Sequence, residues 1–528
     1  MASASPVSPE QLTATVRAGY TFTGACVELG ACVVDGTAYA QTPVRVPLAM
    51  MNRHGLVAGA TGTGKTKTLQ VLAEQLSTAG VPVFLADIKG DLSGVATAGQ
   101  PSDRTTARAA DVGQTWQGMA YPTEFFSLGG QGTGIPIRAT VTSFGPILLS
   151  RVLGLNETQE SSLQLVFHYA DGAGLALLDL KDLKAVISYL VSDEGKAELA
   201  SLGGLSKATA GVILRELSAF EAQGMEPFFG EPEFDTADLL RLAADGRGMV
   251  SCLELADVQQ NPALFSTFLM WMLADLFSDL PEVGDLDKPK LVFFFDEAHL
   301  LFTGASKAFL QAITQTVRLI RSKGVGIFFV TQTPKDVPEE VLAQLANRVQ
   351  HALRAYTPDD AKALRATVST FPKSDYDLTE LLPALGIGEA VVTVMSERGA
   401  PTPVAWTRLR APQSLMAPSD PSLVSSTVAA SPLQAEYGAA VDRESAYERL
   451  NARLVQPGES VPVAAGPDVS PTDVQGPTVP PMTERAPSMI DSALSSPVVK
   501  AAAVAAAATI GREIMRGFFG NARKSRRR

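Results

Sequence analysis

The chain has 528 residues, enough for a large core that is divided among more than one folded unit. Hydrophobic residues make up 46% and charged residues 19%, which is typical of a soluble globular protein, and the formal net charge of −11 argues against a module that is basic over its whole surface. The three cysteines are too few for a disulfide framework, so we expect a reducing, cytoplasmic location. The most apolar late segment, after Lys500, is shorter than the about 20 residues of a membrane-spanning helix, so we expect no transmembrane segment.

Residues 1–50 are predicted to form a short β-hairpin region. The stretch "GACVVDGTAYAQTPVRVPLAM" has β-branched pieces around the turn-forming pair Asp35 and Gly36. The pattern then becomes strand, glycine loop, helix and strand, in "HGLVAGA", "KTKTLQVLAEQLSTAG" and "VPVFLADIKGD". This alternation predicts a parallel sheet covered by helices, and we assign residues 51–96 to its first part.

Residues 97–245 interrupt this alternation. Loop-rich sequence and strand material at "PIRATVTSF" are followed by helical segments such as "ETQESSLQLVFHYADGAG" and "LKDLKAVISYLV". We interpret this region as an inserted, largely helical subdomain. The α/β pattern resumes over residues 246–411, where a wholly apolar strand such as "LVFFF" must be buried on both faces, as at the centre of a parallel sheet.

The composition changes again after residue 411. Residues 412–495 are rich in Pro, Ser and Ala and poor in aromatic side chains. Such a segment cannot bury enough apolar surface to offset its chain entropy, so we predict a mostly disordered linker with one short helical piece. Residues 496–528 end in "GREIMRGFFGNARKSRRR". This basic tail is either an amphipathic helix that contacts anionic lipid, nucleic acid or a protein groove, or a solubilising frayed end.

The most informative stretch is "GATGTGKT", which fits the pattern G-x-x-x-x-G-K-[ST] and lies between an apolar strand and a helix. Gly62 and Gly64 allow successive backbone N–H groups to point at phosphate oxygens beside a helix N-terminus. Lys65 is expected to reach the β- and γ-phosphates, and the Thr66 hydroxyl to bind Mg²⁺. The predicted phosphate-binding residues are Gly59, Ala60, Thr61, Gly62, Thr63, Gly64, Lys65 and Thr66.

Two adjacent acids follow the apolar strand "LVFFF". An acid at the end of a buried strand is costly unless a positive group meets it, so Asp296 is predicted to hold Mg²⁺. Glu297 is predicted to orient and deprotonate an attacking water. The alternative is that the two acids cap a helix that starts there. We expect the pair to face the glycine loop across adjoining strands, and we assign no role to His299, which completes the spelling DEAH.

Gln332 ends the strand "VGIFFVTQ", which we place beside the strand of Asp296, so it is predicted to sense the γ-phosphate or the water. A plain polar strand end is the alternative. Arg321 ends a helix that faces away from its own phosphate site, which suits a finger that reaches the nucleotide of a neighbouring subunit. Arg318 and Lys323 are weaker candidates, and cations at a helix C-terminus also favour the helix dipole by themselves.

The stretches "GATGTGKT", "LADIKGDLSG", "FFDEAHLL", "VRLIRSKGVGIFFVTQTPKDVPEEVLAQLANRV" and "LRAYTPDD", in this order, resemble the HerA/FtsK superfamily of P-loop ATPases. Within it they resemble the bacterial HerA-like helicase group. The resemblance implies an α/β, RecA-like core with a parallel central sheet that binds and hydrolyses ATP with Mg²⁺. It also implies catalytic roles for Glu297, Gln332 and Arg321, and a homo-oligomeric, hexameric ring through which double-stranded DNA is pumped or unwound.

Two points stay open at the level of sequence. Asp87, Lys89 and Asp91 in "DIKGD" either lie near the nucleotide or form a loop-closing salt bridge. The function is either DNA translocation or that of an ATP-dependent assembly or regulatory switch that acts on protein partners without moving DNA. Low net basicity and the long tail favour the switch slightly, whereas a translocase is expected to respond to duplex DNA in a salt-dependent way.

Overall fold

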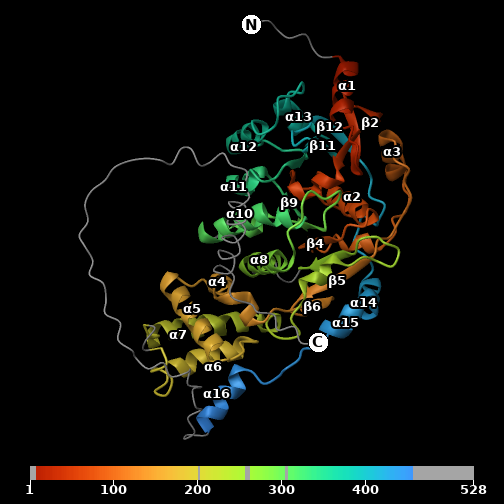
Figure 1. Ribbon diagram of the computed structural model, residues 1–528. Coiled ribbons are helices and arrows are strands. Elements are labelled where there is room, and N and C mark those ends of the chain that lie inside the picture. Colours follow the sequence, from red (N-terminus) through yellow and green to blue (C-terminus); the bar gives the residue numbers. More distant parts are fainter. Residues whose placement is uncertain (1–7, 200–202, 256–261, 304–306, 456–528) are drawn as a thin grey trace, which may run out of the picture.

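The computed structural model describes residues 8–199, 203–255, 262–303 and 307–455 (Figure 1). Among these residues the strands are β1 (Cys26–Val34), β2 (Thr37–Pro47), β3 (Gly55–Ala58), β4 (Val83–Asp87), β5 (Thr123–Leu128), β6 (Ile135–Ile137), β7 (Val250–Glu254), β8 (Leu291–Phe295), β9 (Val325–Thr331), β10 (Asn347–Gln350), β11 (Glu389–Thr393) and β12 (Ala405–Leu409). The α-helices there are α1 (Pro9–Gly19), α2 (Lys65–Thr78), α3 (Asp103–Val112), α4 (Val141–Val152), α5 (Glu157–Gly172), α6 (Leu180–Leu190), α7 (Lys207–Ala222), α8 (Pro262–Asp279), α9 (His299–Phe302), α10 (Lys307–Ile320), α11 (Glu339–Leu342), α12 (Pro358–Val368), α13 (Leu378–Ala384), α14 (Pro421–Ala430), α15 (Pro432–Tyr437) and α16 (Ala446–Val455).

All of these strands belong to one sheet with the order β2-β1-β12-β11-β10-β3-β9-β8-β4-β7-β5-β6. The strands from β10 to β6 run parallel to their neighbours, and β2, β1, β12 and β11 extend the sheet as antiparallel strands. The residues of β8 and β9 are all buried, as expected for apolar strands that are covered on both faces. The predicted α/β fold with a parallel central sheet is confirmed.

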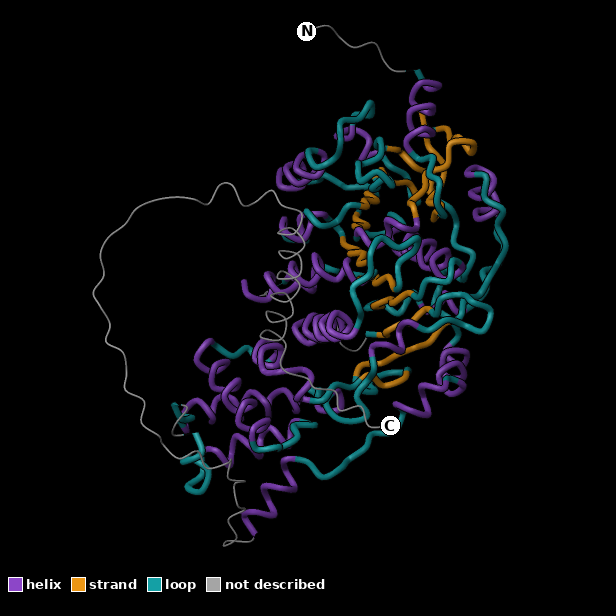
Figure 2. Tube along the Cα trace, viewed as in Figure 1, coloured by secondary structure: helices purple, strands orange, loops and turns teal. Residues whose placement is uncertain are grey.

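Helices cover both faces of the sheet, and each face has its own apolar core (Figures 1 and 2). On one face, Leu69 and Leu72 of α2 pack with Val16 of α1 and with inward-facing strand residues. On the other face, α8 and α10 pack against the sheet through residues such as Met272 and Val317. Because both layers are filled, the carboxyl edge of the parallel strands is where a ligand can approach the sheet.

The helical insert is smaller than the predicted range of residues 97–245. Within that range β5 pairs with β7, and β6 pairs with β5, so both belong to the main sheet. Their residues are all buried, as are those of β8 and β9 in the same sheet. The helices α4 to α7 form the insert and gather below α8 in Figure 1. The strand material expected at "PIRATVTSF" is divided, since β6 ends at Ile137 and Thr140 caps the start of α4.

The ends of the described chain hold more regular structure than the sequence predicts. The hairpin expected within residues 1–50 is present as β1 and β2, and α1 precedes it. The linker predicted to begin at residue 412 contains α15 and α16 around the expected helical piece "LQAEYGAAVDRESAYERLNARL", and also α14, which the sequence does not predict. Tyr437 is 2% exposed and Leu450 1%, and the carbonyl of Tyr437 accepts a 2.7 Å hydrogen bond from Nη1 of Arg138, so this part packs on the core. Residues 456–495 of the linker and the basic tail lie outside the described residues.

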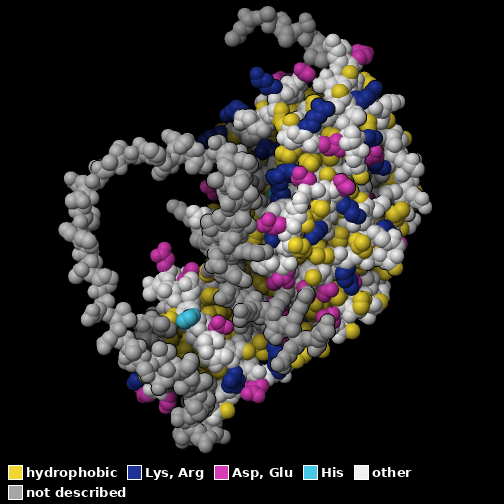
Figure 3. Space-filling view, in the orientation of Figure 1, with side chains coloured by type: hydrophobic (Ala, Val, Ile, Leu, Met, Phe, Trp, Pro, Cys, Tyr) yellow, Lys and Arg dark blue, Asp and Glu magenta, His cyan; other side chains and the backbone are white. Residues whose placement is uncertain are grey.

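None of the described helices is long and apolar enough to cross a membrane. On the described part of the face shown in Figure 3, Lys and Arg side chains are interspersed with Asp and Glu.

Candidate nucleotide-binding site

The glycine-rich loop connects β3 to α2, at the carboxyl end of β3, as the sequence predicts. Gly59, Gly62 and Gly64 have φ values of +156°, +77° and +109°, in the region that favours glycine. A Cβ atom at Gly59 would also lie 2.4 Å from Cβ of His351, which leaves no room for a side chain. The backbone of this loop therefore depends on glycine for both its curvature and its close packing.

Lys65 begins α2 and turns back over the loop. Its Nζ donates hydrogen bonds to the carbonyls of Gly59 at 2.7 Å and Ala60 at 3.2 Å. Burial lowers the pKa of Lys65, and the charges of Glu297 and Asp296 act against this lowering. The lysine therefore already lies between the loop and the two acids, where a phosphate would exchange for the carbonyl contacts.

A buried histidine packs against the phosphate-binding loop. His351 follows β10, is 0% exposed, and its Nε2 lies 2.8 Å from Oγ1 of Thr68 in α2. Burial and the charge of Lys65 lower the pKa of His351 to about 3, so the ring is neutral near pH 7. The sequence gives no local signal for this contact, because the two residues come from distant parts of the chain.

Asp296 and Glu297 lie at the carboxyl end of β8, but the expectation that they face the glycine loop across adjoining strands is wrong. β9 lies between β3 and β8, so one strand separates the loop from the acids. The reason is the crossover of the chain after β8, which places β9 between β3 and β8, two strands that precede it in the sequence. Gln332 follows β9 directly and therefore stands between the loop and the acids.

One carboxylate oxygen of Asp296 meets no hydrogen-bonding group in the described part of the chain. Asp296 is 2% exposed, and its Oδ1 accepts a 2.9 Å hydrogen bond from the backbone nitrogen of Glu297, whereas its buried Oδ2 has no hydrogen-bond partner among the described residues. Burial raises the pKa of Asp296 to about 6, although the charge of Lys89 opposes this. A buried carboxylate with a free oxygen next to a phosphate-binding loop fits a hard cation, since Mg²⁺ prefers oxygen ligands and keeps several sites for water and substrate phosphates.

Glu297 is held by two neighbours. Its Oε1 forms an ion pair with Nζ of Lys89, and its Oε2 lies 3.2 Å from Nδ1 of His299. Burial favours the neutral carboxyl group, but the hydrogen bond and charge of Lys89 outweigh it and lower the pKa of Glu297 overall. Glu297 is thus kept ionised, as a base that accepts a proton must be. His299, to which the sequence assigned no role, is one of its contacts.

The loop after β4 presents Lys89 to the acids. Asp87 is fully buried, and its carboxylate accepts hydrogen bonds from the backbone nitrogens of Lys89 at 3.1 Å, Gly90 at 2.8 Å and Leu92 at 2.8 Å. Asp87 therefore shapes the loop, and Lys89 closes it onto Glu297. Of the two expectations for "DIKGD", the contacts show the loop-closing salt bridge for Lys89.

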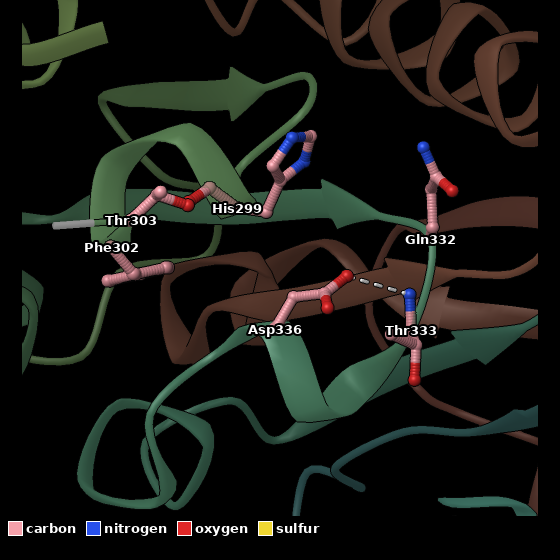
Figure 4. Close-up of a pocket in the computed structure, with 6 residues that line it drawn as sticks. All are labelled: His299, Phe302, Thr303, Gln332, Thr333 and Asp336. Carbon is pink, nitrogen blue, oxygen red and sulfur yellow. Dashed lines mark hydrogen bonds between the residues drawn. The ribbon is translucent and has the colours of Figure 1, made fainter. Parts of the chain in front are cut away.

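Gln332 is exposed and lines a pocket of ≈ 350 Å³ beside the acids. Figure 4 shows the six lining residues, which are His299, Phe302, Thr303, Gln332, Thr333 and Asp336. Oδ2 of Asp336 accepts from the backbone nitrogen of Thr333 at 3.1 Å and from Oγ1 of Thr331 at 2.8 Å. The turn after β9 is therefore fixed, and it holds Gln332 at the edge of the sheet.

The three candidate cations at the end of α10 have different surroundings. Arg321 starts the short helix η7 (Arg321–Lys323) and is exposed, as is Arg318. Lys323 is 2% exposed, and its Nζ donates to the carbonyl of Leu280 at 2.8 Å and lies 4.9 Å from the centre of the Phe277 ring. Because Lys323 is buried, it is excluded as the cation that reaches another subunit. Arg321 precedes β9, so it lies at the opposite end of that strand from Gln332.

The phosphate-binding loop follows β3, the acids follow β8, and a polar residue follows β9, the strand between them. This arrangement places the chain among the P-loop NTPases with a RecA-like core. Residues 34–528 match the Helicase HerA-like C-terminal family, and the chain belongs to this family.

Relatives support this assignment. The chain is 22% identical over 351 residues to the DNA double-strand break repair helicase HerA of Saccharolobus solfataricus. The aligned region covers 66% of this chain and 63% of the relative. It is 24% identical over 361 residues to the protein of that name from Sulfurisphaera tokodaii, covering 66% of this chain and 64% of the relative. The chain therefore spans less than two thirds of the length of these relatives.

Solved structures show the same fold. The unbound bacterial conjugative coupling protein TrwBdeltaN70 superposes with a TM-score of 0.51 at 15% identity, covering 78% of this chain and 95% of that one. The plasmid coupling protein TrwB in complex with the non-hydrolysable ATP analogue ADPNP gives a TM-score of 0.51 at 17% identity, covering 79% and 94% of the two chains.

Proposed function

We propose that this protein is an ATP-hydrolysing motor that translocates or unwinds double-stranded DNA. The observation that carries the proposal is the convergence of Lys65, Asp296, Glu297 and Gln332 at one edge of a RecA-like sheet. The family and the helicase relatives support the same activity. The ATP analogue in the TrwB complex belongs to that protein and supports ATP as the nucleotide here only by likeness.

Each residue of the site has a defined task in this proposal. The backbone nitrogens of residues 59–66 bind the phosphates, and Lys65 leaves the carbonyls of Gly59 and Ala60 to contact the β- and γ-phosphates. Thr66 and Asp296 would hold Mg²⁺, which neutralises charge that develops on the phosphate oxygens. Glu297, ionised beside Lys89, accepts a proton from the attacking water. Gln332 contacts the γ-phosphate or the water and reports its loss to the turn after β9.

The motor is proposed to be a homo-oligomeric, hexameric ring in the cytoplasm. Arg321 is exposed at the end of the sheet opposite its own phosphate site, so it is available to a neighbouring subunit's nucleotide. In a ring this supplies a positive charge in trans during phosphoryl transfer. The three cysteines are free, which fits a reducing compartment.

The alternative of an assembly switch is not favoured. The matched relatives are named as DNA repair helicases, and this likeness supports a DNA motor over a switch that acts on protein partners. The contact proposed for the basic tail stays a prediction, because residues 496–528 lie outside the described part of the chain.

ATP turnover measured with and without duplex DNA tests the proposal. A DNA motor should show a several-fold stimulation that weakens as salt rises, because DNA phosphates are held by cations that compete with salt. Turnover that duplex DNA leaves unchanged at low salt would favour the switch and contradict DNA translocation.

A further inference from the structure

The order of the strands fixes the direction in which a nucleotide lies. β3, which leads into the phosphate-binding loop, has β9 and β8 on one side and β10 and β11 on the other. Asp296, Glu297 and Gln332 all lie on the first side, at the ends of β8 and β9. A triphosphate bound by Lys65 therefore directs its γ-phosphate toward them. Its nucleoside end must extend toward β10 and β11.

The loop of residues 386–388, between α13 and β11, lies against the phosphate-binding loop on that side. The backbone nitrogen of Gly388 donates a 3.0 Å hydrogen bond to the carbonyl of Thr63. A Cβ atom added to Gly64 would lie 3.3 Å from the nitrogen of Gly388 and 3.4 Å from its Cα atom. The two loops are thus in direct contact, and a side chain that projects from residues 386–388 stands beside the phosphate-binding loop.

This loop is fixed before any ligand binds. Arg108 of α3 donates from Nη1 to the carbonyl of Gly388 at 2.7 Å and from Nη2 to the carbonyl of Ile387 at 3.1 Å. On the other side of the turn, the backbone nitrogen of Gly386 donates to Oε2 of Glu389 at 3.1 Å, and Glu389 is 8% exposed. The conformation of Ile387 is therefore set by its neighbours on both sides.

Ile387 is 72% exposed, although it is a large aliphatic residue on a rigid loop. Leaving such a side chain in water forfeits apolar burial that a ligand can supply on binding. The base of a nucleotide has an apolar face, and the strand order directs it to this side of the loop. We propose that Ile387 forms the apolar platform for the nucleobase, with Arg108 as the residue that positions it.

This inference rests on the proposed nucleotide binding and adds to it the residue that contacts the base. An aliphatic side chain packs on the face of a purine and makes no hydrogen bond to its exocyclic groups. A site that reads a base in this way discriminates weakly between adenine and guanine, since strong rejection requires a hydrogen-bonding group that is left unpaired by the wrong ligand. Ile387 therefore contributes binding to MgATP and MgGTP alike.

Replacement of Ile387 in the full chain tests this role. We expect Ile387→Ala to raise KM for MgATP and for MgGTP by roughly three- to ten-fold with kcat nearly unchanged, because the lost contact is equal in the ground state and the transition state. Ile387→Leu, which keeps the apolar surface, should restore KM. Leu242→Ala is the matched control, since Leu242 is an aliphatic residue that is 53% exposed and precedes β7, away from the phosphate-binding loop.

Magnesium tripolyphosphate, which has no base, separates a base contact from a disturbed phosphate site. Its inhibition constant should be the same for the wild-type chain and for Ile387→Ala. An equal weakening of tripolyphosphate and MgATP would overturn the proposal, as would an unchanged KM for both nucleotides. If Ile387→Ala leaves KM unchanged but lowers the mass of the protein in solution, the proposal is overturned, and Ile387 instead contacts a neighbouring subunit. A wild-type chain that binds no nucleotide would overturn the proposed function as well, so the two failures are distinguishable.

Discussion

Lys89 and Glu297 form an ion pair between two loops that are 208 residues apart in the sequence. The loops follow β4 and β8, which are neighbouring parallel strands. Glu297 has a φ of +48°, in the left-handed region that costs a residue other than glycine on the order of 1–3 kcal/mol unless its surroundings hold it. The ion pair is one of the contacts that hold the carboxylate at the edge of the sheet, where the proposed reaction takes place.

Replacing Lys89 should therefore impair turnover more than binding. We expect Lys89→Met to lower kcat roughly ten-fold and to leave KM for MgATP nearly unchanged, because the base loses its partner while the phosphate-binding loop is intact. Lys89→Arg, which keeps the charge, should recover part of kcat. Steady-state ATPase kinetics measure both quantities.

The double variant Lys89→Met, Glu297→Gln gives the control for this coupling. If Lys89 acts through Glu297, the double variant should be no slower than Glu297→Gln alone, since residues in one contact are not additive. A further ten-fold loss in the double variant would show that Lys89 acts by another route.

Removing the lysine of the phosphate-binding loop should abolish nucleotide binding or turnover. In Lys65→Ala the β- and γ-phosphates lose their cation, and the carbonyls of Gly59 and Ala60 lose the donor they have in the free protein. Equilibrium binding of a fluorescent ATP analogue together with phosphate release measures the effect. Binding and turnover at wild-type levels would show that the nucleotide lies elsewhere.

Mixed rings test whether Arg321 acts across a subunit interface. Neither Arg321→Ala nor Lys65→Ala alone should hydrolyse ATP efficiently, but mixing them should restore some activity, because some interfaces then join an intact arginine to an intact phosphate-binding loop. Arg318→Ala removes an exposed cation of α10 three residues before Arg321 and is the control: it should not show the loss and recovery of activity that we expect for Arg321→Ala. No recovery in mixtures that light scattering shows to be co-assembled would contradict a role in trans.

His54 makes the stability of the nucleotide-free chain depend on pH. It is 2% exposed, its Nδ1 accepts a 3.0 Å hydrogen bond from the backbone nitrogen of Ile327, and burial lowers its pKa from 6.5 to about 4. The unfolded chain therefore binds a proton between pH 6.5 and 4 that the folded chain does not, so this contribution to stability is lost as pH falls through that window.

His54→Asn should weaken this dependence. Asparagine does not titrate, can accept the same hydrogen bond, and tolerates the φ of +57° at this position. Thermal unfolding midpoints measured at pH 7, 6, 5 and 4 should fall less steeply for the variant than for the wild-type chain. Equal slopes would show that the proton binds elsewhere.

The parts of the site that come from one continuous stretch were predictable from sequence. The glycines and Lys65 lie between a strand and a helix, and Asp296, Glu297 and Gln332 follow two apolar strands. The pattern of apolar residues and the glycine-rich motif were therefore enough to place these residues at one edge of the sheet. The order of the strands was not accessible in this way, because local patterns do not show that β9 lies between β3 and β8.

Contacts between distant segments were also missed. The pairing of His351 with Thr68 and of Gly388 with Thr63 depends on how the strands cross, as does the choice of Glu297 as the partner in the salt bridge of Lys89. The helices α14 to α16 carry too few apolar residues to predict packing from composition alone, and they are ordered by surfaces elsewhere, such as the contact of Arg138 with Tyr437.

Glu297→Gln, compared with the wild-type chain for both ATP binding and phosphate release, tests most directly that the acids after β8 complete the phosphate-binding loop. The amide has the shape of the carboxylate but cannot accept the proton of the attacking water. MgATP should bind with an affinity close to that of the wild-type chain, while phosphate release falls by about 10²-fold or more. Phosphate release near the wild-type rate would contradict the role of Glu297 and the arrangement of the site built on it.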